Sequence, residues 1–94
     1  MIGKLDGDLK ESIDAYVRDG RPTGGFLQAC IENDLSEAVK RADENNLRRI
    51  PEIVSYLYND CPSYCWGFKG AFERWLEVRR LELDGDLKES IDAN

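Results

Sequence analysis

The residues with the clearest potential for chemistry form a short loop before an apolar segment: Arg21, Pro22, Thr23, Gly24 and Gly25. Pro22 fixes its φ angle and has no N–H, and the two glycines carry no Cβ, so the backbone can bend tightly and leave its amides accessible. We expect Thr23 to cap a helix that begins at about Gly25. The unpaired N–H groups at that helix start, beside Arg21, would attract an anion such as a nucleotide phosphate. The alternative is an ordinary capped helix start.

Other side chains give little support for catalysis or metal binding. The chain contains no His, which removes the commonest general base and the Ser–His and Cys–His nucleophile pairs. Cys61 and Cys65 are separated by three residues rather than by the two of a redox CxxC motif. With Cys30 they make an odd number, which disfavours a disulfide framework and leaves a structural zinc site one ligand short. We therefore predict no catalytic residues, no metal site and no cofactor in a protein that is not an enzyme.

The remaining charged residues are predicted to cap helices or to face solvent. The strongest catalytic pairing would place Asp34 or Asp43 beside Arg21. Charged residues at such positions are more often helix caps. A second arrangement would join Arg21 to Arg48 or Arg49 around a phosphate, if the fold brought them together.

The overall charge limits the classes of partner. The chain has 94 residues, with 13 Lys and Arg against 19 Asp and Glu, which gives a net charge of −6. This balance disfavours binding to a nucleic-acid backbone or to an anionic membrane surface. No apolar run approaches the ~20 residues that cross a bilayer, and the N-terminus lacks the apolar core of a signal peptide. We therefore expect a cytoplasmic protein.

The apolar periodicity predicts an all-α fold, a compact bundle of four to six short helices in which residues 1–82 form a single helical domain. The expected helices cover residues 5–19 with a stop at Gly20, residues 26–42, about 50–59, and 68–82. Cap-type residues near Asn33 leave open whether the second segment is one helix or two. Because Pro is tolerated only in a first turn, Pro51 predicts that the third helix starts near Ile50. We expect Trp75 to anchor the core.

The loop expected at residues 59–67 is unusually rich in aromatic and cysteine side chains. Such a loop is typical of a segment that closes the open end of a bundle. Aromatic residues also dominate the hot spots of protein interfaces. The residues predicted to contact a protein partner are Tyr56, Tyr58, Tyr64 and Trp66.

The sequence of residues 83–93 is identical to that of residues 5–15. Each copy has four acidic residues and one Lys, so each contributes −3, and the two account for the whole net charge of −6. Only the first copy continues into Tyr16 and Val17, whose burial is worth about 1.5–3 kcal/mol each, so we expect it to occupy the groove on the body. The segment 83–94 is left as an extra helix or tail. It hangs free, links copies of the chain into a homo-oligomer, or has no role.

Several short motifs occur together between Tyr16 and Gly67. They are Pro22-Thr23-Gly24-Gly25-Phe26-Leu27, Asn33-Asp34-Leu35 with Glu37-Ala38, Arg41-Ala42-Asp43 with Asn46, Ile53-Val54 with Tyr56 and Tyr58-Asn59, and Pro62 with Cys65-Trp66-Gly67. This combination resembles a group of small phage and prophage proteins of unknown function. The resemblance implies a phage-derived accessory protein in the bacterial host cytosol and supplies no established activity. Pro51 and the repeated C-terminal segment depart from the pattern.

Three functions are left open. The leading hypothesis is a non-enzymatic phage accessory protein that binds a host protein and thereby inhibits a host defence system. The second is a protein that binds or sequesters a nucleotide or another small anion at Arg21, Thr23, Gly24 and Gly25. The third is a self-assembling structural protein whose copies are linked through residues 83–94.

Overall fold

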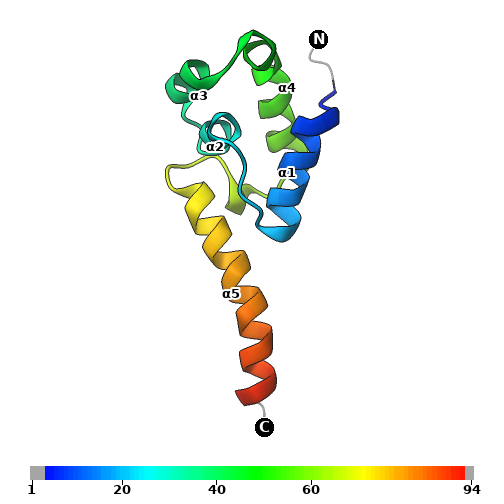
Figure 1. The fold of residues 1–94 in the computed structure, drawn as a ribbon, viewed down its shortest axis with the longest axis vertical. Coiled ribbons are helices and arrows are strands. Elements are labelled where there is room, and N and C mark those ends of the chain that lie inside the picture. Colours follow the sequence, from blue (N-terminus) through cyan, green and yellow to red (C-terminus); the bar gives the residue numbers. More distant parts are fainter. Residues whose placement is uncertain (1–3, 93–94) are drawn as a thin grey trace.

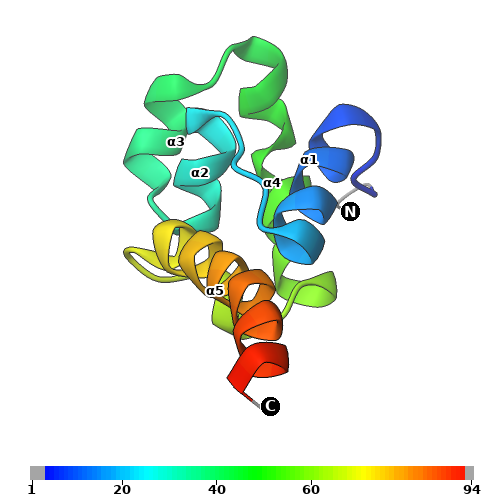
Figure 2. The ribbon, with the colours of Figure 1, turned by 60° about the horizontal axis from the view of Figure 1, so that its bottom comes forward.

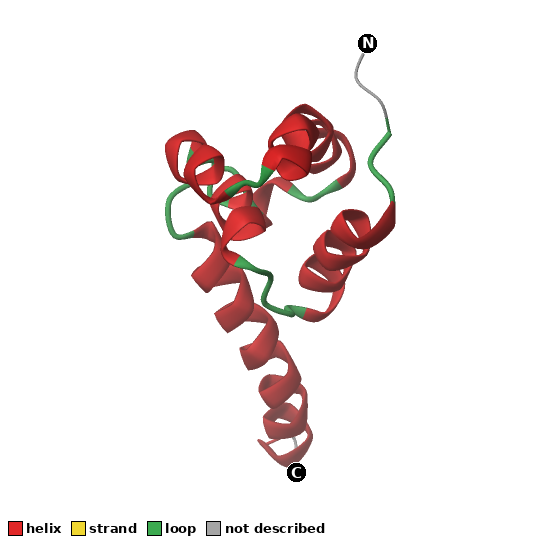
Figure 3. Ribbon diagram, turned by 45° about the horizontal axis from the view of Figure 1, so that its top comes forward, coloured by secondary structure: helices red, strands yellow, loops and turns green. Residues whose placement is uncertain are grey.

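Five α-helices and one 3-10 turn make up the described part of the chain. The computed structural model describes residues 4–92, with side chains for residues 4–82. The elements are α1 (Gly7–Asp19), α2 (Gly25–Ile31), α3 (Leu35–Arg41), α4 (Glu44–Asp60), the 3-10 turn η1 (Ser63–Cys65) and α5 (Ala71–Asp92). Figure 3 shows helices joined by loops throughout this part of the chain, without a strand. The predicted all-α bundle is confirmed.

The core lies where α1, α2, α4, η1 and α5 meet. Its fully buried large side chains are Ile13, Tyr16, Ile31, Ile53, Leu57 and Cys65. These positions lie three or four residues apart within α1 and α4, which places them on one face of each helix. Cys65, from the loop predicted to close the bundle, is fully buried in this core. In the described part of the chain, no helix is both long and apolar enough to cross a membrane.

Tyr16 joins α1 to the start of α5. Its hydroxyl donates hydrogen bonds to the carbonyl oxygens of Cys65 at 2.8 Å and of Ala71 at 3.3 Å. Its ring stacks on Phe72, with the centroids 5.2 Å apart. The Nε1–H of Trp75 donates in return to the carbonyl oxygen of Tyr16 at 2.9 Å. The polar atoms of both side chains have hydrogen-bond partners, so burying these side chains leaves no polar group unsatisfied. Trp75 is buried and anchors the core as expected.

The segment 26–42 forms two helices rather than one. Asn33 has φ 59°, in the left-handed region, and so ends the helical path of α2. Asp34 then caps α3 by accepting a hydrogen bond from the backbone N–H of Glu37 at 3.2 Å. The alternative of a break near Asn33 is therefore the correct one.

The predicted start of the third helix near Ile50 is wrong, because α4 begins at Glu44. The carboxylate of Asp43 accepts a hydrogen bond from the N–H of Asn46 at 2.8 Å, and this cap starts the helix before Pro51 is reached. Pro51 lies inside α4 and leaves the carbonyl of Leu47 without its helical N–H. Both residues are exposed, so water can satisfy that carbonyl.

The cap at Asp43 gives a direct stability test. We expect Asp43→Ala to lower the free energy of unfolding by about 1 kcal/mol, the usual cost of losing an N-cap side chain. Asp43→Asn keeps an oxygen acceptor and should retain most of the stability. Urea denaturation measures both values. Equal losses for the two variants would show that the cap hydrogen bond does not hold this helix start.

Two further helix starts differ from the predictions. Thr23 is not the N-cap of α2: that position is Gly24, and the Thr23 hydroxyl donates instead to the carbonyl of Gly24 at 3.0 Å. The last helix begins at Ala71 rather than at Phe68, since Gly70 has φ 84° and is not helical. Gly20, with φ 68°, does end α1 as predicted.

The last helix continues past Glu82 to Asp92, so the backbone of the second sequence copy extends α5 directly. Figure 1 shows this part of α5 running out beyond the other helices, away from α3 and α4. The molecule measures 54 × 23 × 19 Å along its principal axes. The side chains of residues 83–94 lie outside the described set, so their predicted role in linking copies stays a prediction.

Candidate protein-binding surface

The loop predicted to bind an anion opens onto a hollow with acidic walls. This hollow has a volume of about 240 Å³ and is lined by Gly25, Gln28, Ala29, Glu32, Asp34, Glu37 and Arg41. Arg41 lies against Gly25, where a Cβ would come within 2.6 Å of its Nη1, and its Nε is 3.0 Å from a carboxylate oxygen of Glu37. The side chain of Arg21 is exposed. Three carboxylates and one already paired guanidinium disfavour an anion in this hollow.

The four aromatic residues predicted to contact a partner do not form one patch. Tyr58 is 76% exposed, and its ring meets that of Trp66 edge-on with the centroids 6.4 Å apart. Tyr64 is 61% exposed, but its ring packs against Trp75 at 5.1 Å. The fourth, Tyr56, is half-buried and belongs to a polar cluster. The structure thus brings Tyr58 and Trp66 together and places the other two elsewhere.

The polar cluster around Tyr56 holds α1 against α4. The Tyr56 hydroxyl is hydrogen bonded to Asp14, which also pairs with the Nζ of Lys10 at 2.9 Å. Burial and the hydrogen bond to Asp14 raise the pKa of Tyr56 to about 12. Burial disfavours the charge on Asp14, but the hydrogen bonds from Tyr56 and Lys10 outweigh it, so the pKa of Asp14 is lowered. These contacts give Tyr56 a structural role.

Arg49 is engaged beside this cluster rather than near the loop at Arg21. Its guanidinium contacts Glu52 at 2.7 Å and Asp6 at 3.2 Å, which ties the start of α1 to α4. The predicted pairing of Arg21 with Arg49 around a phosphate therefore gains no support from the contacts of Arg49.

The thiols are poorly suited to nucleophilic chemistry. Burial raises the pKa of Cys30 to about 11 and that of Cys61 to about 12, and it also raises the pKa of Cys65. All three are therefore protonated at neutral pH, whereas the thiolate is the reactive form. Among the side chains that the structure describes, no group of three or more Cys, Asp or Glu residues is placed to hold a metal ion.

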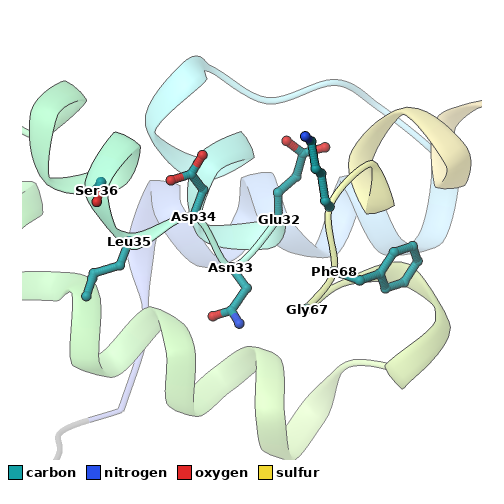
Figure 4. A pocket seen from close by; sticks show the side chains of 8 residues that line it. Glu32, Asn33, Asp34, Leu35, Ser36, Gly67 and Phe68 are labelled. Atoms are coloured by element: carbon teal, nitrogen blue, oxygen red, sulfur yellow. The ribbon is translucent and has the colours of Figure 1, made fainter.

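Exposed apolar side chains gather instead on two neighbouring helices. Of the eight large hydrophobic residues that are exposed among residues 4–82, five belong to α3 and α4: Leu35, Val39, Leu47, Val54 and Tyr58. We call these five residues the α3–α4 face. Leu35 is 65% exposed, and it lines the same narrow apolar hollow as Val54 of the facing helix. Figure 4 shows the Leu35 side chain directed toward α4.

α4 carries more apolar surface than the core covers. Ile53 and Leu57 are fully buried, yet Val54 and Tyr58, each one position later, are exposed. Leu47 lies seven residues before Val54 and continues the same exposed strip along the helix. An apolar strip outside the core on a helix of a small domain is typical of an interaction site.

A polar hollow adjoins this face at the start of α3. It has a volume of about 510 Å³ and is lined by Glu32, Asn33, Asp34, Leu35, Ser36, Gly67, Phe68 and Lys69 (Figure 4). The N–H of Gly67 donates to the carbonyl oxygen of Ile31 at 2.7 Å, which fixes the loop that forms one wall. Leu35 lines this hollow as well as the apolar one. The α3–α4 face therefore has a polar border, as protein interfaces do.

Sequence reasoning missed four of these five residues, because it assigned their apolar side chains to the core. One signal was present. In α4 the apolar positions Leu47, Ile50, Ile53, Val54, Leu57 and Tyr58 cover a wider arc than one core-facing stripe needs.

Comparison of the chain with protein-family models, with curated proteins and with solved structures finds no match. The resemblance of its motifs to phage proteins therefore stays a prediction.

Proposed function

We propose that this chain is a non-enzymatic protein-binding domain that contacts its partner through the α3–α4 face. The observation that carries the proposal is the exposure of five large apolar side chains on two adjoining helices beside a polar hollow. Such an apolar centre with a polar border is the usual anatomy of a protein interface. Leu35 of α3 and Val54 of α4 line one hollow, so the apolar surface is shared between the two helices.

The class of partner that we propose comes from the motif combination resembling phage proteins. Leu35, Val54 and Tyr58 belong both to those motifs and to the α3–α4 face. A small phage accessory protein that presents this face would bind a host protein, and a component of a host defence system fits that role. Protonated thiols and the helix-capping roles of Asp34 and Asp43 support a function based on contact rather than on catalysis.

Two exposed tyrosines provide a matched test. The immobilised chain is used to capture host proteins from a bacterial lysate, and each captured protein is then purified for measurement of its Kd. We expect Tyr58→Ala to weaken binding by about 30-fold, because truncation of an interface hot spot costs at least ~2 kcal/mol. Leu35→Ala should also weaken binding. Tyr64→Ala removes an exposed tyrosine outside the face and should change the Kd less than about threefold.

Two outcomes would overturn the proposal. One is the failure of any purified host protein to bind the native chain. The other is a partner whose Kd is insensitive to both Tyr58→Ala and Leu35→Ala, since that partner would use a different surface.

A further inference from the structure

We propose that the α3–α4 face also binds the C-terminal part of α5, residues 83–92, from a second copy of the chain. The result is head-to-tail self-association. This inference goes beyond partner binding, because it commits the same surface to a different occupant when the protein is alone. It rests on the sequence repeat and on the direction in which α5 leaves the globule.

The repeated sequence is one that this protein already packs as a helix. Residues 83–93 are identical to residues 5–15, and their apolar members are Leu83, Leu87 and Ile91. In the first copy the matching residues are Leu5, Leu9 and Ile13. Leu5 and Ile13 are buried and Leu9 packs against the core. Leu5 precedes α1, which begins at Gly7, so the helical part of the first copy packs through Leu9 and Ile13. The sequence repeats this spacing at Leu87 and Ile91, so a helix of the second copy is expected to carry the same short apolar strip.

The groove of the first copy is not open to the second. α1 continues into Tyr16, which is fully buried and donates its hydroxyl to the carbonyl of Cys65. The second copy has Asn94 at the matching position, so exchange would leave the place of the Tyr16 ring empty. The second copy therefore needs a different apolar surface, and the α3–α4 face is exposed on the same molecule.

The direction of α5 requires that the two surfaces come from different molecules. Figures 1 and 2 both show the far end of α5 pointing away from α3, and Figure 1 shows it running out beyond α4 as well. The lengths also match. At 1.5 Å per residue, residues 83–92 span about 15 Å, and the strip from Leu47 to Tyr58 on α4 spans about 17 Å.

Sedimentation velocity of the pure full-length chain, from low to high micromolar concentration, tests the inference. We expect the native chain to associate increasingly with concentration. Leu35→Lys, which disrupts the face, and Leu87→Asp, which disrupts the extension, should each leave a monomer. An equimolar mixture of these two variants should form a complex of two chains, because one retains an intact extension and the other an intact face. Ser12→Lys adds the same charge at an exposed position of α1, outside the face, and should associate like the native chain.

Several results would overturn the inference. A native chain that stays monomeric at all concentrations would overturn it. A Leu35→Lys variant that associates normally would also overturn it, because that result would indicate pairing between α5 helices. A mixture of the two variants that remains monomeric would exclude the head-to-tail arrangement. Because these measurements contain no host protein, a host protein that binds a strictly monomeric chain would leave the proposed function intact and remove this inference alone.

Discussion

Replacement of Tyr16 by alanine is expected to lower the free energy of unfolding by about 3–5 kcal/mol, the range for truncation of a buried aromatic side chain. The Tyr16 side chain is fully buried. Alanine removes the stack on Phe72 and leaves a cavity where α1 meets α5. It also removes the hydrogen bonds to the carbonyls of Cys65 and Ala71. For a small domain this is a large part of a total stability of about 5–15 kcal/mol.

Chemical denaturation followed by tryptophan fluorescence measures this loss. Tyr16→Phe keeps the ring and removes only the hydroxyl, so its cost should be smaller, about 1–3 kcal/mol from the unpaired carbonyls. Tyr58→Ala is the exposed control and should change stability by no more than about 0.5 kcal/mol. Similar losses for Tyr16→Ala and Tyr58→Ala would contradict the central place of Tyr16 in the core.

The fold class was predictable because its signals are local. Apolar spacing places Ile13 and Tyr16 on one face of α1, and Gly20 ends that helix through a left-handed conformation that glycine adopts at little cost. The cap-type residues near Asn33 indicated the break between α2 and α3 for the same reason. Each of these signals depends on a few neighbouring residues, so tertiary packing was not needed to recognise them.

The errors at helix starts show where local rules compete. Pro51 predicted a late start for α4, but the cap formed by Asp43 and the burial of Ile53 and Leu57 stabilise a longer helix around the proline. Thr23 has the side chain of a good N-cap, yet its hydroxyl donates to the Gly24 carbonyl instead. The preference of threonine for N-cap positions does not say whether its hydroxyl will pair with a helix N–H or with a neighbouring carbonyl.

The α3–α4 face could not be predicted from residue types, because exposed and buried apolar residues look the same in a sequence. Ile53 and Val54 are adjacent, apolar and β-branched, but the first is fully buried and the second is 39% exposed. The difference arises from the position of α4 against the core, which places only one side of the helix inside. Surface sites of this kind become visible only once the packing is known.

These two neighbours provide the second large predicted effect. Ile53→Asp places a carboxylate in the core without a partner, and we expect it to lower the free energy of unfolding by more than about 4 kcal/mol. In Val54→Asp the carboxylate reaches water, so the change should stay within about 1 kcal/mol. Circular dichroism and urea denaturation of the two variants measure the difference.

The pair also separates folding from binding. The Val54→Asp chain should stay helical and cooperative in unfolding, while its charge on the α3–α4 face weakens both host-protein binding and self-association. Ser55→Asp adds the same charge at the next position, outside the face, and should bind and associate normally. If Val54→Asp unfolds the chain as severely as Ile53→Asp, then Val54 is part of the core and the α3–α4 face is not an open surface. If it folds and binds like the native chain, the face is open but does not make the contact.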